Sequence, residues 1–89
     1  MPWKIEFSVE AYRELRKLDP QHSKRIVKFL KERLATLDEP RSIGQALQGS
    51  RLGEFWRYRV GPFRLICKIE DDRLLVLVLR VGDRKEIYR

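Results

Sequence analysis

Six consecutive Leu and Val residues, from Leu74 to Leu79, form the most apolar stretch of this chain. An apolar run of this length without polar alternation predicts a strand that is buried on both faces. Such a strand lies in the interior of a sheet, so other elements have to surround it. The 89 residues are enough for a single modest core, and we expect one domain over residues 1–89.

The residues before this strand predict one strand and two helices. Apolar and polar side chains alternate over residues 2–7, which indicates a strand with one buried face. Ser8 is the expected N-cap of a short helix that ends near residue 18. A second helix begins at Asp19-Pro20, because proline is tolerated at the first helical position, and its apolar stripe continues to about Leu37.

The remaining segments predict a loop and two further strands. Residues 38–53 contain three glycines and a proline and show no sustained period, which is typical of a loop. Alternation returns over residues 54–60 and 63–69, and Gly61-Pro62 supplies a tight turn between them. The order β-α-α-β-β-β predicts an α+β fold, with an antiparallel sheet of about four strands and a two-helix hairpin packed on one face.

The charge balance narrows the classes of partner. Twenty Lys and Arg against thirteen Asp and Glu give a net charge of +7, which favours nucleic acid, an anionic membrane surface or an acidic protein. The single cysteine, Cys67, has no partner for an internal disulfide, and no Cys/His cluster predicts a metal site. The chain shows neither a signal peptide nor a membrane span. We therefore expect a cytoplasmic protein that has no membrane partner.

Strand alternation predicts that basic side chains gather on the sheet face away from the helices. The expected members of this face are Arg57, Arg59, Arg64 and Lys68. Like charges on adjacent strands repel each other, and an anionic ligand would relieve the repulsion. Guanidinium groups bind phosphate bidentately, so a phosphodiester backbone suits this face best. For any one of these arginines, an ion pair with a nearby carboxylate explains its position as well as phosphate binding does. The carboxylates concerned are Glu54, Glu70 and Asp72. The four basic residues together favour phosphate.

The last residues extend this pattern. Arg80 is expected to continue the basic face, and Arg84 and Tyr88 follow within the last nine residues. Guanidinium groups beside a tyrosine favour the phenolate and lower the pKa of the phenol. That would allow Tyr88 to transfer a proton, stack on a base or bind a phosphate, although a lone terminal tyrosine is usually packing material.

Three motifs together resemble RelE-type toxins of bacterial and archaeal toxin-antitoxin modules, in the RelE/StbE branch of the RelE/ParE superfamily. They are the opening strand with an acidic, Tyr-containing helix from Ile5 onward, the Gly-x-x-Arg signature at Gly61-Pro-Phe-Arg64, and Val81-Gly-Asp-Arg-Lys-Glu-Ile-Tyr88 after the apolar strand. The resemblance covers essentially the whole chain. It implies a fold like that of small microbial ribonucleases and a toxin that cuts mRNA in the ribosomal A site and so inhibits translation.

The resemblance also implies roles for individual residues. Arg64 matches the arginine that stabilises the transition-state phosphate, and Arg84 matches the arginine near the leaving 5'-oxygen. Tyr88 matches the tyrosine that orients or deprotonates the 2'-hydroxyl and holds a base. Arg57 and Arg59 fall where the family has paired basic residues that bind substrate. Attack by the 2'-hydroxyl requires neither metal nor cofactor, so the expected activity is that of a metal-independent endoribonuclease.

Asp83 departs from the family pattern, because many relatives carry histidine before the tail arginine. It is a turn residue after Gly82 or a candidate base, and we count it with Lys68 and Arg80 among the expected substrate-contacting residues. The sequence leaves open whether Asp83 or Tyr88 transfers a proton. His22, the only histidine, is expected on the surface and outside the site.

Two other functions fit the same sequence. One is a ParE-type toxin, which shares the fold and inhibits DNA gyrase without cutting RNA. The other is a binding module that has lost activity and only binds its antitoxin. The resemblance implies a RelB-like acidic antitoxin as partner in every case, with operator DNA contacted indirectly through that antitoxin. The nuclease would in addition bind the ribosome and mRNA.

Overall fold

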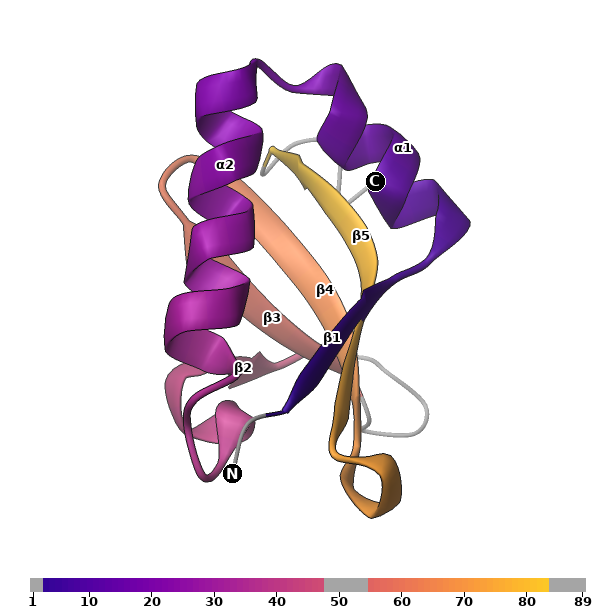
Figure 1. The fold of residues 1–89 in the computed structure, drawn as a ribbon, viewed down its shortest axis with the longest axis vertical. Helices are drawn as coiled ribbons and strands as arrows, with labels where there is room; N and C mark the ends of the chain where they lie inside the picture. Colours follow the sequence, from indigo (N-terminus) through magenta and orange to yellow (C-terminus); the bar gives the residue numbers. More distant parts are fainter. Residues whose placement is uncertain (1–2, 48–54, 84–89) are drawn as a thin grey trace.

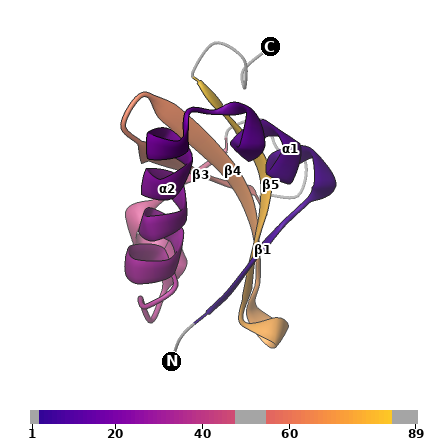
Figure 2. The same ribbon diagram turned by 45° about the horizontal axis from the view of Figure 1, so that its top comes forward.

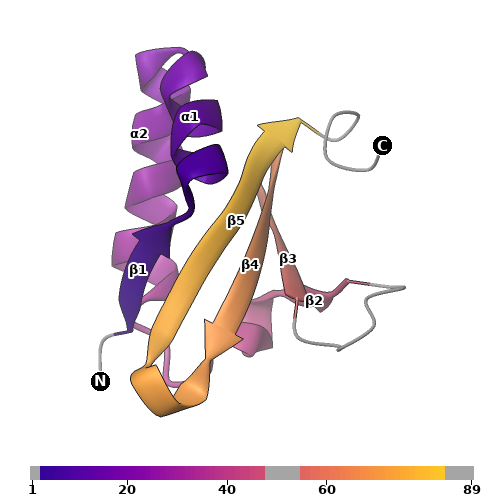
Figure 3. The same cartoon turned by 90° about the vertical axis from the view of Figure 1, so that its right-hand side faces the viewer.

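A computed structural model describes residues 3–47 and 55–83, which form one five-stranded sheet with two helices on one of its faces (Figure 1). The elements are β1 (Lys4–Phe7), α1 (Val9–Lys17), α2 (Pro20–Lys28), β2 (Gln45–Ala46), β3 (Phe55–Val60), β4 (Phe63–Glu70) and β5 (Leu75–Asp83). The side view in Figure 3 places both helices on the same side of β3, β4 and β5. The predicted α+β class, with helices covering one sheet face, is confirmed.

The sheet has the order β1-β5-β4-β3-β2, and its first pair is parallel. β1 runs alongside β5 from Lys4 opposite Leu75 to Phe7 opposite Val78, whereas the other three pairs are antiparallel. The sheet is therefore mixed, with five strands in place of about four antiparallel ones. β1 and β5 are far apart in the sequence, so no hairpin dictates their relative direction. The predicted loop over residues 38–53 contains β2, whose two residues are too few to produce a period.

Helix α1 begins at the predicted N-cap. The hydroxyl oxygen of Ser8 accepts a hydrogen bond of 3.0 Å from the backbone N–H of Ala11, and the same hydroxyl donates to the carbonyl of Leu79 at 3.0 Å. Ser8 thus ties the start of α1 to β5. Beyond this point α1 lies along the part of β5 that β1 does not cover, as Figure 2 shows from a second angle.

Helix α2 begins at Pro20, as predicted, and Asp19 occupies the N-cap position. The carboxylate of Asp19 makes no capping hydrogen bond, but its carbonyl accepts from the backbone N–H of Ser23 at 3.1 Å. After Lys28 the helix continues with wider π-helical turns over Phe29–Leu34. The helical segment therefore ends about three residues before the predicted end.

The core lies between the helices and the sheet. Ile26, Leu30 and Leu34 are fully buried along α2 and its extension. They belong to one cluster with side chains of β3 and β4 that alternate with the basic residues. These include Tyr58, Val60, Leu65 and Cys67, with Trp56 and Phe63 packed at its margin. Complete burial raises the pKa of the Cys67 thiol, which is inert packing material here. No helix within the described residues is long and apolar enough to cross a membrane.

The turn Gly61-Pro62 joins β3 to β4 as a hairpin closed by Val60 opposite Phe63. Gly61 adopts a φ of 59°, in the left-handed region that favours glycine. A Cβ atom at this position would lie 2.7 Å from a guanidinium nitrogen of Arg25, so glycine also allows Arg25 to pack on the hairpin.

Candidate functional site

Two arginines face each other across the β3–β4 hairpin on the side of the sheet away from the helices. The register pairs Arg59 directly with Arg64, while Arg57 pairs with Ile66 and Lys68 with Phe55. Residues directly opposite on antiparallel strands have Cβ atoms about 5 Å apart. The structure therefore confirms that alternation brings these basic residues to one face, and it pairs two of them, Arg59 and Arg64, directly across the hairpin. We call Arg57, Arg59, Arg64 and Lys68 the basic face.

The members of the basic face differ in their side-chain contacts and in their exposure. Arg57 donates a side-chain hydrogen bond to Oε1 of Gln45, its partner across β2 and β3. Arg59 is exposed, and Arg64 and Lys68 are half-buried. None of these last three makes a side-chain hydrogen bond or ion pair with another residue in the described ranges 3–47 and 55–83. Arg59 and Arg64 thus present two guanidinium groups that can take up an anion without first breaking a pair.

Buried apolar side chains share the sheet face that carries the basic residues. Ile66 shares this face with Arg57, its cross-strand partner, and only 7% of its surface is exposed. Leu75 on β5 has the parity of this face as well and is 2% exposed. Charged groups next to buried apolar surface are poorly hydrated, which strengthens their attraction for a phosphate.

A β-bulge in β5 decides on which side Arg80 lies. Cys67 pairs with Val78 but Ile66 pairs with Arg80, so Leu79 is the extra residue. Because Val78 faces the helices, strict alternation would turn Arg80 toward the helices too. The bulge instead places Arg80 opposite Ile66 and turns Val81 into the core, where it is 1% exposed.

Although Arg80 has the parity of the basic face, its guanidinium binds Glu14 of α1. Nη2 and Nε lie 2.9 Å and 3.1 Å from Oε2 of Glu14, and the other carboxylate oxygen accepts from the backbone N–H of Val81 at 2.8 Å. Arg80, which the sequence assigned to substrate binding, therefore ties β5 to α1. Its role toward substrate stays a prediction.

The end of β5 places Gly82 next to Arg64. Gly82 pairs with Arg64 and Asp83 pairs with Phe63. Arg64 therefore has Arg59 on one flank and a residue without a side chain on the other. Asp83 is exposed and takes the parity of Phe63, which faces the helices, so the structure does not bring it onto the basic face. Arg84 and Tyr88 lie outside the described residues.

The carboxylates that were alternative partners for the arginines have other contacts. Glu70 pairs with Arg73 at 3.2 Å, and neither Glu70 nor Asp72 pairs with the basic face in the described part of the chain; Glu54 lies outside it. Two polar contacts, of Gln45 with Arg57 and of Glu14 with Arg80, could not be predicted from the sequence, because both join elements far apart in the chain. His22, which was expected on the surface, is half-buried and packs edge-on against Phe63 with ring centroids 5.0 Å apart; it lies away from the basic face, as predicted. The described residues hold no group of His, Cys, Asp or Glu that could bind a metal ion.

Comparison with known proteins adds independent information. Residues 5–88 match the family model described as the ParE toxin of the type II toxin-antitoxin system parDE. The chain is 36% identical over 89 residues to Toxin RelG of Mycobacterium tuberculosis, across 100% of this chain and 99% of that protein.

Solved structures agree with these similarities. The chain resembles one in the RelBE2 toxin-antitoxin complex of M. tuberculosis with a TM-score of 0.82 and 32% identity, covering 94% of this chain and 93% of that chain. It also resembles one in the intact RelBE toxin-antitoxin complex of Escherichia coli, with a TM-score of 0.67, 25% identity, and coverage of 91% and 95%.

Proposed function

Because this chain is a RelE-type toxin of the RelE/ParE superfamily of type II toxin-antitoxin systems, we propose that it is a metal-independent endoribonuclease. It cleaves mRNA in the ribosomal A site and thereby inhibits translation. The observation that carries this proposal is the cross-strand pair of Arg59 and Arg64, which lies on the open sheet face without a carboxylate partner among the described residues.

The proposed chemistry is an internal transesterification. The 2'-oxygen forms a bond to the adjacent phosphorus, the bond from phosphorus to the 5'-oxygen breaks, and the products are a 2',3'-cyclic phosphate and a free 5'-hydroxyl. A proton leaves the 2'-hydroxyl and another reaches the leaving oxygen. Negative charge grows on the phosphoryl oxygens, and Arg64 with Arg59 beside it supplies fixed positive charge there. Arg84 and Tyr88 are proposed to act near the leaving oxygen and the 2'-hydroxyl.

Mapping of transcript ends by primer extension after induction tests the proposal. The wild-type toxin should produce new 5' ends at fixed codon positions, and Arg64→Ala should reduce their yield about 100-fold or more, as removal of a transition-state donor does elsewhere. Arg84→Ala should act in the same direction. Arg73→Ala is the matched control, because it removes an equal charge from the turn that follows β4, nine residues beyond Arg64. Full toxicity of both Arg64→Ala and Arg84→Ala would contradict the proposed nuclease function.

A second candidate is inhibition of DNA gyrase, which the description of the matching family model favours. It predicts a DNA-damage response and intact mRNA after induction, with gyrase cleavage complexes in a purified reaction. The nuclease predicts the reverse. A chain that does neither but still binds its antitoxin would be the inactive binding module.

We further propose that a RelB-like acidic antitoxin neutralises this toxin, since two of the similar structures are toxin-antitoxin complexes. The net charge of +7 favours an acidic partner. Operator DNA would be contacted through the antitoxin. Coexpressed toxin and antitoxin should copurify at moderate salt, and failure of the purified pair to associate at low ionic strength would contradict the proposal.

A further inference from the structure

A second cationic surface adjoins the basic face at the β3–β4 hairpin. A groove of about 520 Å³ runs between the α2 helical segment and the β3–β4 hairpin. Four basic residues and a single carboxylate line it: Arg25, Lys28, Arg33 and Arg59, with Glu32. We call this the hairpin groove. Its charge predicts an anionic occupant.

The hairpin groove is continuous with the basic face through Arg59. This residue is the cross-strand partner of Arg64 and also lines the groove with Val60 and Gly61. Arg25 extends the cationic surface, because the absence of a Cβ at Gly61 lets its guanidinium lie against the hairpin backbone. An elongated anion bound at Arg64 can therefore continue over Arg59 into the groove.

The groove cations differ from other arginines of this chain in their partners. Arg41 lies 2.6 Å from Asp71, Arg80 lies 2.9 Å from Glu14 and Arg73 lies 3.2 Å from Glu70. In contrast, the basic residues of the groove form no ion pair with any residue of the described ranges. Unpaired like charges that share one concave surface repel each other and favour binding of an external anion.

We propose that the hairpin groove binds backbone phosphates of the RNA strand that continues from the scissile phosphate on the basic face. This inference rests on the proposed nuclease function and adds a second subsite to it. Arg25 and Arg33 are eight residues apart, roughly 12 Å along a helix. At about 3.4 Å per stacked nucleotide, the groove spans roughly three nucleotides.

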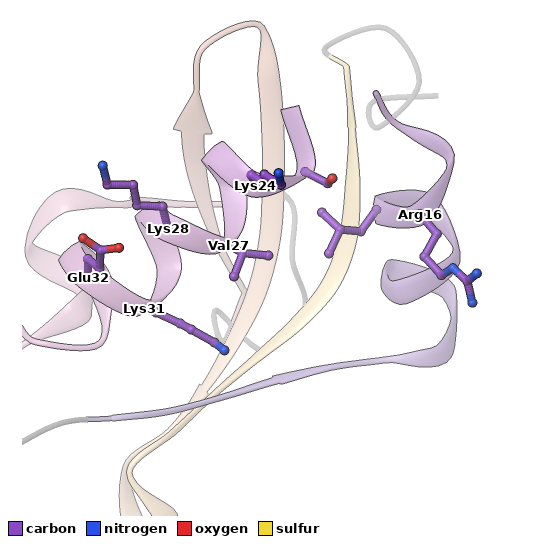
Figure 4. Close-up of a pocket in the computed structure, with 8 residues that line it drawn as sticks. Arg16, Lys24, Val27, Lys28, Lys31 and Glu32 are labelled. Atoms are coloured by element: carbon purple, nitrogen blue, oxygen red, sulfur yellow. The ribbon is translucent and has the colours of Figure 1, made fainter. Parts of the chain in front are cut away.

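A peptide would find a better site elsewhere on the same helix. The groove between α1 and α2 has an apolar floor that includes Leu15 and Val27. In Figure 4, Val27 and Lys31 point into the gap between the two helices, whereas the guanidinium of Arg16 on α1 points away from it. The α1–α2 groove is lined by as many basic residues, but Leu15 and Val27 give it an apolar surface that suits an amphipathic segment. The hairpin groove differs because Arg59 lines it, which joins it to Arg64 on the basic face. RNA is therefore the favoured occupant of the hairpin groove.

The test compares two double variants with the same change in charge. Arg25→Ala/Arg33→Ala removes two cations from the hairpin groove, and Lys24→Ala/Lys31→Ala removes two from the α1–α2 groove. Binding of a fluorescent, 2'-O-methylated RNA of about 12 nucleotides is measured by anisotropy over a range of salt, because each phosphate contact to a single strand contributes about −0.7 to the slope of log K against log salt. Methylation prevents cleavage.

The groove variant should lower the magnitude of this slope by about 1.4 and weaken binding, while the control should keep the wild-type slope. Arg33→Ala alone should lower it by about 0.7, which guards against misfolding after loss of the Arg25 contact. Equal slopes for groove variant and control, or no binding of this RNA by the wild-type toxin, would overturn the inference. Loss of antitoxin binding with an unchanged RNA slope would assign the groove to the antitoxin instead. Cleavage by Arg64→Ala tests the nuclease separately, so either proposal can fail alone.

Discussion

Substitution of Glu14 tests directly whether α1 secures β5, the strand beside the basic face. Its carboxylate binds the guanidinium of Arg80 through Oε2 and the backbone N–H of Val81 through Oε1, at 2.9 Å and 2.8 Å. Glu14→Gln removes the charge but retains an oxygen for Val81. Glu14→Ala removes both contacts. The pair of variants therefore separates the ion pair from the backbone hydrogen bond.

The expected magnitudes follow from exposure. The side chains of Arg80 and Glu14 are 41% and 25% exposed, so solvent screens the ion pair, and its loss in Glu14→Gln should cost about 0.5–1 kcal/mol. The hydrogen bond to Val81 is partly buried and its acceptor is charged, so Glu14→Ala should cost a further 1–1.5 kcal/mol or so. A total of about 2 kcal/mol corresponds to a fall in Tm of roughly 8–16 °C for a domain of this size.

Urea denaturation followed by circular dichroism measures both losses. Glu6→Gln is the matched control, since Glu6 is an exposed carboxylate on β1 without an ion pair among the described residues, and it should change the free energy of unfolding by less than about 0.5 kcal/mol. Losses for Glu14→Ala no larger than that of the control would refute the inference that Glu14 secures β5. Equal losses for Gln and Ala would show that the bond to Val81 contributes nothing.

Two further predictions concern turns. Gly61→Ala should lower the free energy of unfolding by about 1–2 kcal/mol in urea titrations, because φ is 59° there and the new Cβ would meet Arg25 at 2.7 Å; wild-type stability would contradict the assigned turn. Hydrogen bonds from Arg41 hold the pKa of Asp71 below its ordinary value of 3.8, so the pair stabilises the fold above about pH 4 and this contribution disappears as pH falls through the lowered pKa. Asp71→Asn should accordingly lose less stability than the wild type between about pH 5 and pH 2, and identical profiles would count against the pair.

Local signals in the sequence predicted much of the fold. The Ser8 cap, the Pro20 start and the Gly61-Pro62 turn each depend on a few adjacent residues, and each is present in the structure. Alternation also predicted correctly that Arg59 and Arg64 share the face away from the helices. This succeeded because a two-residue turn fixes the register of the hairpin, and register determines side-chain direction.

Alternation and turn signals could not predict how distant segments pair in the sheet. The parallel direction of β1 and the addition of β2 depend on contacts between segments separated by tens of residues, for which alternation carries no information. Gln45 was assigned to a loop, although it lies beside Arg57 in the sheet and accepts its hydrogen bond. Partners of this kind become visible only when the strand order is known.

The bulge at Leu79 links α1 to the site on the far side of the sheet. A bulge leaves backbone groups without their ladder partners, and here α1 binds groups on both sides of it. Ser8 donates to the carbonyl of Leu79, and Glu14 accepts from the N–H of Val81. Because a one-residue shift exchanges the two faces of a strand, these contacts decide that Val81 is buried and that Gly82 lies opposite Arg64. Helix α1, which contributes no residue to the basic face, thus fixes the position of β5 beside Arg64.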